Sequence, residues 1–296
     1  MDYHSRVKEE FGRQAETLSV AQAFTDSWVL EQIYGAIKPT KMMDLLDLGC
    51  GPGIVTASLA PDVQEVVAYD LTPEMLDKAR QRCEKAGLKN VRFKLGSAEE
   101  LPFKNKSFDC VVTRLTVHHF PDPRRVMEEV VRVTRRKGKV VVADVVSSED
   151  EEEAALHNAL ETLRDPTHVQ MLSTSGLLEL LKESGLKITS KVTWEMKRDY
   201  DEWIRITNAP DRVEATLYHN GRLGHPGNSG RHQSSFRRKN CGFQSSLVVG
   251  YRREITLLSG EYTGGKRFLA VQRSPSLMSS PWYSSIGGRR DERYLL

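Results

Sequence analysis

The sequence predicts a doubly wound α/β fold with a mostly parallel sheet, N-terminal helices and an irregular C-terminal tail. Between residues 41 and 194, short apolar runs typical of buried strands alternate with amphipathic segments of helical periodicity. This alternation is typical of parallel strands joined by crossover helices. The first apolar run also leads through a glycine-rich turn into a helix, in the stretch LDLGCGPGI at Leu46–Ile54.

Each predicted element has its own local signal. Five strands are predicted first: MDLLDLG, EVVAYD, VRFKLG, FDCVVTR and KGKVVVADVV. Helices are predicted at about Ile54–Leu59, Pro73–Ala86, Pro123–Arg135, Asp150–Leu163 and Gly176–Glu183, the last capped by Ser173 or Ser175. Thr72 and Gly87 are the expected start and stop signals of the second helix, and Gly138 is expected to end the third. LKITSKVTW alternates as a sixth strand should.

Composition divides the chain into three regions: a helical cap over 1–40, a ligand-binding domain over 41–210 and an atypical tail over 211–296. The tail contains 12 Ser, 11 Gly and 12 Arg and has no helical periodicity. Only the pieces SLVVGYRR and RFLAVQR predict strands there. Two interpretations of the tail stay open: a disordered basic segment, or the product of out-of-frame translation.

Composition also narrows the class of protein. No apolar run approaches the ~20 residues of a membrane span, and the charged N-terminus does not suit a secretory signal, so a cytoplasmic location is expected. The four cysteines form no CxxC pair, which predicts reduced thiols and no metal site. The tail carries 14 Lys and Arg against 6 Asp and Glu, which leaves the rest acidic. An acidic body predicts no nucleic-acid partner, while the oligomeric state stays open.

The glycine loop does not fit a phosphate-binding motif. Its glycines are Gly49, Gly51 and Gly53, whereas the dinucleotide fingerprint GxGxxG needs a third glycine where this chain has Ile54 or Thr56. No GxxxxGK[ST] sequence is present either. Asp47 precedes the loop at the strand end that faces a ligand. Since a carboxylate suits an amine or a sulfonium better than a pyrophosphate, the loop favours a positively charged ligand.

The second strand ends in another acid, Asp70. An acid at this position accepts hydrogen bonds from ribose hydroxyls in nucleotide-binding sheets. The alternative role is a favourable carboxylate at the N-terminus of the next helix, and the two roles are compatible.

Several motifs in order carry a family resemblance. They are LLDLGCGPG, VVAYD, GSAEELPFKNKSFDCVV and LTVHHFPDPRRVMEEVVRVTRRKGKVVVAD. Over about Phe11–Trp194 the chain resembles class I S-adenosylmethionine-dependent methyltransferases, which have a Rossmann-like fold. It is most similar to the branch that includes the ubiquinone and menaquinone biosynthesis C-methyltransferases. The resemblance implies a methyltransferase acting on a small-molecule acceptor, such as a quinone precursor or another metabolite.

The resemblance also implies the residues that bind S-adenosylmethionine. These are Asp47, Gly49, Gly51 and Gly53 at the amino-acid part, Asp70 at the ribose, Leu71, Ser97 and Ala98 at the adenine, and Arg114 with Leu115 at the methionine end. The family commonly has Asp or Asn where this chain has Ser97, whose hydroxyl is shorter and uncharged. The N-terminal FxxxAxxY pattern appears as Phe11, Ala15 and Leu18, with Leu in place of Tyr, which puts the lid role of this helix in doubt.

Four residues are candidates for binding or deprotonating the methyl acceptor. His118 and His119 follow the fourth strand at the edge where α/β sheets bind ligands, so either is a candidate base, with His119 preferred. The alternative is that both only fix the turn. Asp144 is a candidate partner for an acceptor hydroxyl or for the nearby turn, and His168 is a candidate pocket residue.

Two other functions stay open at this point. One is a nicotinamide-dependent oxidoreductase, which the glycine spacing disfavours. The other is a cofactor-binding homologue that has lost catalysis, which the departures at Leu18 and Ser97 and the atypical tail make plausible. The sequence does not identify the acceptor or whether its C, N or O atom is methylated.

Overall fold

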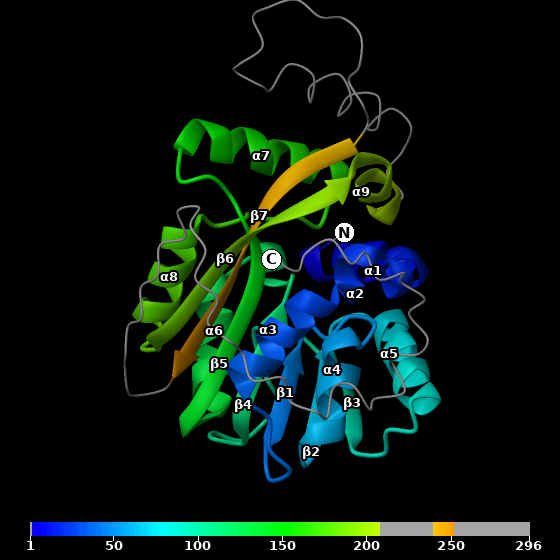
Figure 1. The fold of residues 1–296 in the computed structure, drawn as a ribbon, viewed down its shortest axis with the longest axis vertical. Coiled ribbons are helices and arrows are strands. Elements are labelled where there is room, and N and C mark those ends of the chain that lie inside the picture. Colours follow the sequence, from blue (N-terminus) through cyan, green and yellow to red (C-terminus); the bar gives the residue numbers. More distant parts are fainter. Residues whose placement is uncertain (1, 208–238, 252–296) are drawn as a thin grey trace, which may run out of the picture.

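A seven-stranded sheet forms the centre of the molecule, with helices on both faces (Figure 1). The computed structural model describes residues 2–207 and 239–251. The strands are β1 (Asp44–Leu48), β2 (Glu65–Asp70), β3 (Val91–Leu95), β4 (Phe108–Arg114), β5 (Thr134–Val146), β6 (Lys187–Asp199) and β7 (Lys239–Tyr251). The helices are α1 (Tyr3–Val20), α2 (Gln22–Thr25), α3 (Ser27–Ile37), α4 (Ile54–Leu59), α5 (Pro73–Lys85), α6 (Pro123–Val133), α7 (Glu151–Arg164), α8 (Thr174–Glu183) and α9 (Tyr200–Thr207), with short 3₁₀ turns η1 (Ala60–Asp62) and η2 (Val117–His119).

The order of strands across the sheet is β3-β2-β1-β4-β5-β7-β6. The first five strands in this order are parallel, and β7 pairs antiparallel with both β5 and β6. The order reverses between β1 and β4, so the chain leaves these two strands toward opposite faces of the sheet, which forms a crevice in doubly wound sheets. The predicted doubly wound, mostly parallel fold is confirmed.

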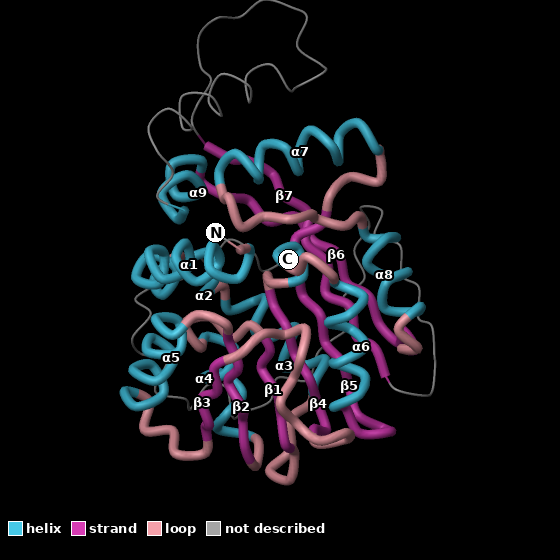
Figure 2. Tube along the Cα trace, turned by 180° about the vertical axis from the view of Figure 1, so that it is seen from behind, coloured by secondary structure: helices cyan, strands magenta, loops and turns pink. Residues whose placement is uncertain are grey.

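Successive side chains of each strand point alternately into two apolar layers, one on each face of the sheet. Leu46, Val67 and Val111 pack on the face covered by α6 and α8, which is seen from behind in Figure 2. Their neighbours Leu45 and Val66 pack on the opposite face against α3 and α4. Both faces of the central strands are therefore buried, which explains why their sequences are continuously apolar rather than alternating.

The helix before β5 is shorter than predicted. It ends at Val133, and Gly138 lies inside β5 instead of ending the helix. A Cβ at Gly138 would lie 2.8 Å from the carbonyl oxygen of Asp109 and 2.7 Å from Cγ2 of Thr134. This glycine therefore permits a close approach between β5 and β4, at the point where their register shifts.

The start and stop signals of the other helices agree better with the structure. The hydroxyl of Ser173 accepts the N–H of Gly176, so Ser173 is the cap of α8. Gly87 follows α5 with φ +68°, the left-handed conformation of a helix stop. Thr72 precedes α5, although its side chain makes no capping hydrogen bond.

The segment that composition sets apart contributes the strand β7. SLVVGYRR predicts a strand, and its residues up to Tyr251 belong to β7, where Val248 is fully buried. RFLAVQR lies outside the described residues. The antiparallel β7 fills the space between β5 and β6, so β6 joins the sheet only through a strand from far along the chain.

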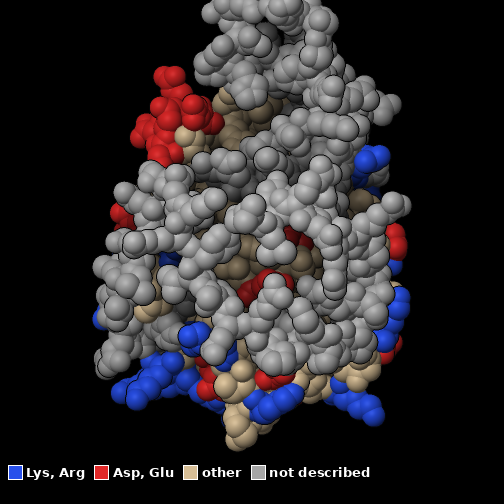
Figure 3. Space-filling view, in the orientation of Figure 1, with Lys and Arg blue, Asp and Glu red and all other residues tan. Residues whose placement is uncertain are grey.

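Helices α1 and α2 lie beyond the carboxyl ends of the parallel strands, whereas α3 lies against one face of the sheet (Figure 1). One small apolar cluster joins Leu18 of α1, Met75 of α5 and Ile206 of α9. Figure 3 shows acidic side chains gathered at the upper left, where α7 begins with Glu151, Glu152 and Glu153. No helix in the described ranges is both long and apolar enough to span a bilayer.

Candidate functional site

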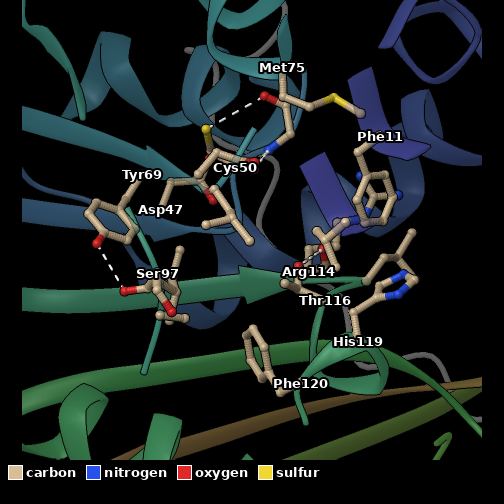
Figure 4. Close-up of a pocket in the computed structure, with 18 of the residues that line it drawn as sticks. Phe11, Asp47, Cys50, Tyr69, Met75, Ser97, Arg114, Thr116, His119 and Phe120 are labelled. Carbon is tan, nitrogen blue, oxygen red and sulfur yellow. Dashed lines mark hydrogen bonds between the residues drawn. The ribbon is translucent and has the colours of Figure 1, made fainter. Parts of the chain in front are cut away.

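A cavity lies at the carboxyl ends of β1, β2 and β4, beneath α1 (Figure 4). Its walls bring together most of the residues that the sequence predicts for the cofactor and several others: Tyr3, Phe11, Asp47, Gly49, Cys50, Gly51, Asp70, Leu71, Ser97, Ala98, Arg114, Leu115, Thr116 and His119. These residues come from segments up to 116 positions apart in the chain, so only the folded sheet makes them neighbours.

The three glycines of the loop have different tasks. All have positive φ, of +66°, +50° and +75° for Gly49, Gly51 and Gly53. A Cβ at Gly49 would lie 2.4 Å from Cγ2 of Thr116, and one at Gly53 would lie 2.7 Å from Cβ of Ala79. A Cβ at Gly51 would meet no atom within 4 Å. Gly49 and Gly53 therefore allow close packing, whereas Gly51 leaves space at the cavity wall.

Asp70 connects the end of β2 to the glycine loop. Its Oδ2 accepts the N–H of Gly51 at 2.8 Å, and its Oδ1 accepts the N–H of Thr72 at 2.9 Å. Burial raises the pKa of Asp70, although these backbone hydrogen bonds act in the opposite direction. Each carboxylate oxygen keeps further acceptor capacity toward the cavity.

Asp47 is almost completely buried behind the loop, with 1% of its surface exposed. Its Oδ2 accepts the hydroxyl of Thr56 at 2.5 Å. Burial raises the pKa of Asp47 to about 7, and the charge of Asp70 adds to this effect, while Thr56 and Arg114 oppose it. The carboxyl group is therefore poised between its neutral and charged forms near neutral pH.

Arg114 ends β4, and Leu115 begins the turn that follows it. The Arg114 guanidinium donates to the carbonyl of Phe24 at 2.7 Å, which ties α2 to the sheet edge. Burial lowers the pKa of Arg114 to about 10, although the charges of Asp26 and Asp47 oppose this effect. Leu115 has φ +54°, which is rare for a side chain of its kind and marks stored backbone strain at the cavity wall.

Ser97 follows β3 at the opposite end of the cavity. Its hydroxyl accepts the N–H of Glu99 at 3.3 Å, and its carbonyl accepts the hydroxyl of Tyr69 at 2.9 Å. Ala98 is partly buried against the main apolar core. The local turn therefore fixes the direction of the Ser97 backbone, and Ala98 offers an apolar surface.

The two adjacent histidines after β4 have separate surroundings. His118 Nδ1 lies 2.6 Å from Asp144 Oδ1, and Asp144 also accepts the N–H groups of Val117 and Val145 at 2.7 and 2.8 Å. Burial alone would lower the pKa of His118, but Asp144 outweighs it and the pKa is raised. His118 does not line the cavity under α1, and Asp144 lies at the end of the His118 side chain. Asp144 thus links the His118 ring to the backbone of the turn, and His118 lines a different, neighbouring cavity.

His119 points its ring at the N-terminal helix. Its Nδ1 lies 3.0 Å from the Thr167 carbonyl oxygen, and its ring meets the ring of Phe11 edge to face at 4.9 Å. The Thr167 hydroxyl also lies 3.2 Å from Nδ1, but it donates its proton to Asp165. Both Thr167 oxygens near Nδ1 therefore act as acceptors, so Nδ1 carries the proton and Nε2 is the acceptor. No described residue bonds to Nε2. Burial and the neighbouring His118 lower the pKa of His119 to about 4, so the ring is neutral at neutral pH.

A second cavity begins on the other side of His119. Phe11, Leu18, Phe24, Leu115 and His119 line both cavities. His168 lines only the second one, where its Nε2 lies 2.7 Å from Oδ1 of Asn158. Burial lowers the pKa of His168 to about 4. Gly53 and Ala15 line neither cavity, and both are packing positions.

Sequence patterns did not point to several residues of the site. Tyr3 donates its hydroxyl to the Thr167 carbonyl at 2.8 Å and also contacts the carbonyl of His119, so it fastens the first turn of α1 over the site. Gln14, Thr116 and Asp165 also line the cavities. Single polar residues without a spacing pattern carry no sequence signal, and only the tertiary contacts reveal them.

Comparison with known proteins identifies the family to which this chain belongs. Residues 46–142 match the family described as "Methyltransferase domain". The uncharacterized methyltransferase YcgJ of Bacillus subtilis is 35% identical over 176 residues, which are 59% of this chain and 70% of YcgJ. The chain belongs to the S-adenosylmethionine-dependent methyltransferases.

Other comparisons cover a larger share of this methyltransferase or add a relative whose name states its acceptor. The uncharacterized protein YafE of Escherichia coli is 30% identical over 201 residues, 68% of this chain and 95% of YafE. The crystal structure of YcgJ superposes with a TM-score of 0.70 and 29% identity over 77% of this chain and 99% of that one. A demethylmenaquinone methyltransferase of Clavibacter sepedonicus is 34% identical over 109 residues, 37% of this chain and 44% of that enzyme.

The methyltransferase uses S-adenosylmethionine, and the cavity under α1 fits it. The space beside Gly51, the carboxylate of Asp70 and the buried acid Asp47 suit a ligand with a ribose and a cationic amino acid rather than a pyrophosphate. The nicotinamide alternative is therefore wrong. Among the residues described, no group of three or more His, Cys, Asp or Glu is arranged to hold a metal ion.

Proposed function

We propose that this methyltransferase transfers a methyl group from S-adenosylmethionine to an oxygen or carbon atom of a small-molecule acceptor. The observation that carries the proposal is the position of His119, whose ring stands between the two cavities with an unoccupied acceptor nitrogen. The cofactor cavity lies on one side of this ring, and we assign the other cavity to the acceptor.

The cofactor residues take the roles that their surroundings support. Asp70 accepts the ribose hydroxyls, because its oxygens keep acceptor capacity beside the open space at Gly51. Leu71 and Ala98 contact the faces of the adenine, and the hydroxyl of Ser97 accepts from its amino group. Gly49 and Gly53 act by permitting the loop to close on Thr116 and Ala79.

Asp47 and Arg114 hold the amino-acid end of the cofactor. The buried carboxylate of Asp47 stabilises the ammonium group through the loop, and this cation in turn favours the charged form of Asp47. Arg114 contributes positive charge at the carboxylate end while its bond to Phe24 keeps α2 in place. A cationic and an anionic side chain thus match the two charges of an amino acid.

S-adenosylmethionine supplies an already activated methyl group, so the protein has to align the acceptor and exclude water. His119 accepts a hydrogen bond from the acceptor hydroxyl at Nε2, since its other nitrogen is held by Thr167. Phe11 packs edge to face on the His119 ring and closes the site from above. The strained turn at Leu115 separates the two cavities.

A hydroxylated ring is the acceptor that suits these surroundings. Aromatic and aliphatic side chains at the junction of the cavities provide flat apolar contacts, and His119 provides the polar contact. The name of the Clavibacter relative identifies a quinone precursor as its own acceptor, which supports a related chemistry for this chain.

Radioactive methyl transfer to a metabolite library tests the proposal. The full chain is first titrated with S-adenosylmethionine, S-adenosylhomocysteine and NADH by calorimetry. We expect the first two ligands to bind and NADH to leave the heat signal flat. Transfer of label to a hydroxylated small molecule supports the function. Tight binding of the cofactor with no transfer to any compound of the library supports instead the non-catalytic alternative.

A further inference from the structure

The second cavity has a polar wall that the proposed function leaves unexplained. Besides His119 and Thr207, its polar lining consists of Gln14 of α1, the histidines His118 and His168, and the α7 end with Glu161, Arg164 and Asp165. The inference drawn from this wall rests on the proposed function, because it assigns the cavity to the methyl acceptor. It concerns which chemical groups the acceptor carries.

Gln14 offers hydrogen-bond donors with nothing to receive them. The side chain is 1% exposed, and its amide nitrogen Nε2 has no hydrogen-bond partner among the described residues. A buried amide without a partner is costly, so such groups are rare unless a ligand or water completes them. Because Gln14 lines the cavity, an oxygen atom of a ligand there can accept from it.

Asp165 offers a negative charge that belongs to no ion pair among the described residues. Its Oδ1 accepts the N–H and the hydroxyl of Thr167 at 2.9 and 2.6 Å, and no ion pair within the described ranges includes it. Burial raises the pKa of Asp165, but the Thr167 hydrogen bonds and the charge of nearby Arg164 help to outweigh it and the pKa is lowered. The group is therefore charged at neutral pH.

The remaining charges of the wall occur in pairs. Glu161 accepts from Arg164 at 2.5 Å and from the indole of Trp203 at 3.1 Å. His118 is paired with Asp144 at 2.6 Å. His168 has a pKa of about 4 and is neutral. With these groups neutralised or uncharged, the carboxylate of Asp165 leaves the wall with excess negative charge, which opposes entry of an anion.

We propose that Gln14 and Asp165 determine acceptor specificity by selecting an uncharged compound that carries a hydroxyl group and a carbonyl oxygen. The Gln14 amide donates to the carbonyl oxygen, and Asp165 Oδ2 accepts from a hydroxyl. A carboxylate in place of the carbonyl group is rejected, because Asp165 repels it and no unpaired cation of the described wall receives it.

Two nearly isosteric probes test this selectivity without knowledge of the natural acceptor. The full chain is saturated with S-adenosylhomocysteine and titrated with 4-hydroxyacetophenone, which is uncharged, and with 4-hydroxybenzoate, which is an anion. Ligand-observed NMR provides both dissociation constants. We expect the uncharged probe to bind at least about tenfold more tightly, as the loss of one good polar contact at a buried site implies.

Two variants then assign the selectivity to its residues. Gln14→Met keeps the length of the side chain and removes the donors, so 4-hydroxyacetophenone is expected to bind about tenfold more weakly. Asp165→Asn retains the Oδ1 acceptor for Thr167 and removes the charge, so the preference over 4-hydroxybenzoate should fall about tenfold. Glu9→Gln, at an exposed position of the same helix that lines neither cavity, is the matched control and should change neither value.

The outcomes separate this inference from the proposed function. If the wild-type protein binds S-adenosylhomocysteine but binds the two probes equally, or prefers the anion, the specificity proposal is wrong and the cofactor assignment stands. If S-adenosylhomocysteine itself fails to bind, the proposed function is overturned. The wild-type comparison needs no variant, and S-adenosylhomocysteine affinity verifies that each variant is folded.

Discussion

The carboxylate of Asp70 lies 2.8 Å from the backbone nitrogen of Gly51, so the acid at the end of β2 holds the middle of the glycine loop. One side chain thereby fixes the loop and borders the cavity beneath α1, at the place that we assign to the ribose. A residue that both shapes a site and faces its ligand affects affinity more strongly than an acid that does only one of these.

Asp70→Asn should weaken binding of S-adenosylhomocysteine by about 10- to 100-fold, because hydrogen bonds to a charged group contribute ~1.5–3 kcal/mol. Calorimetric titration measures the change. Asp77→Asn on the exposed side of α5 is the matched control and should bind like the wild type. Equal affinity of the Asp70 variant and the control would show that Asp70 does not contact the cofactor.

Gly51→Ala and Gly87→Ala separate backbone strain from ligand space. Both glycines have positive φ, and a Cβ at either one meets no protein atom within 4 Å. Each variant should therefore lose about 1–2 kcal/mol of unfolding free energy, measured by urea denaturation. Gly51→Ala should also lose cofactor affinity, because its methyl group enters the cavity, whereas Gly87→Ala should not. Similar cofactor affinities in the two variants would count against the cavity assignment.

Cofactor binding should release protons near neutral pH. The pKa of Asp47 is about 7 in the free protein, and a bound ammonium group lowers it, so affinity should increase as the pH rises from 6 toward 7 and then level off. Calorimetry in buffers of different ionisation enthalpy counts the released protons. Asp47→Asn should abolish the release. A wild-type proton count of zero at pH 6.5 would contradict the role of Asp47.

The His118 and Asp144 pair should stabilise the fold most in mildly acidic solution. The raised pKa of His118 gives stability that is complete below its ordinary value near 6.5 and is lost as the pH rises through the folded pKa. The lowered pKa of Asp144 gives stability above about 3.8 that is lost as the pH falls through its folded value. The pair therefore contributes fully between about pH 4 and 6.5.

Asp144→Asn tests this window by urea denaturation at pH 5, 7 and 9. We expect a loss of about 3–5 kcal/mol at pH 5, since one partner of a buried pair is left alone, and a smaller loss at pH 9. Glu149→Gln nearby, whose carboxylate bonds the exposed Ser175, is the control for a surface acid. A loss that is the same at all three pH values would argue that no charged pair forms.

His119→Phe should retain cofactor binding but slow transfer to any acceptor found in the library by about 10²- to 10⁴-fold, as loss of a polar contact to the reacting proton implies. Because the pKa of His119 is about 4, the wild-type rate should not fall between pH 8 and 6 through protonation of this ring. Initial rates across this range at saturating cofactor check both expectations. Undiminished turnover by the variant would remove His119 from the reaction.

Local patterns predicted the elements of the fold well and their ends less well. The apolar runs of β1 to β5 and the proline and glycine signals around α5 depend on neighbouring residues, so the sequence contains them. The predicted end of α6 was wrong, because Gly138 does not stop this helix but allows close packing against Asp109 in another strand. The position of β7 between β5 and β6 depends on pairing between residues about 100 positions apart, which no local pattern expresses.

The candidate site likewise has residues that the sequence could predict and residues that it could not. That the glycine loop, Asp70 and the region of Arg114 line one cavity was predictable, because strands that end at the carboxyl edge of a parallel sheet place their next residues together at that edge. The different roles of His118 and His119 were not, since adjacent residues with the same chemistry received opposite pKa shifts from Asp144 and from burial. Gln14 gave no signal, because an unpartnered donor is defined only by what surrounds it.

By itself, the sequence determined the doubly wound sheet, the glycine loop and the acids at the carboxyl edge of the sheet, because apolar periodicity and turn chemistry act over a few residues. The tertiary structure alone decided that His119 stands between two cavities and that Gln14 and Asp165 meet the second one. Burial, electrostatic environment and unsatisfied hydrogen bonds are properties of neighbours in space, and these arise only when distant segments pack together.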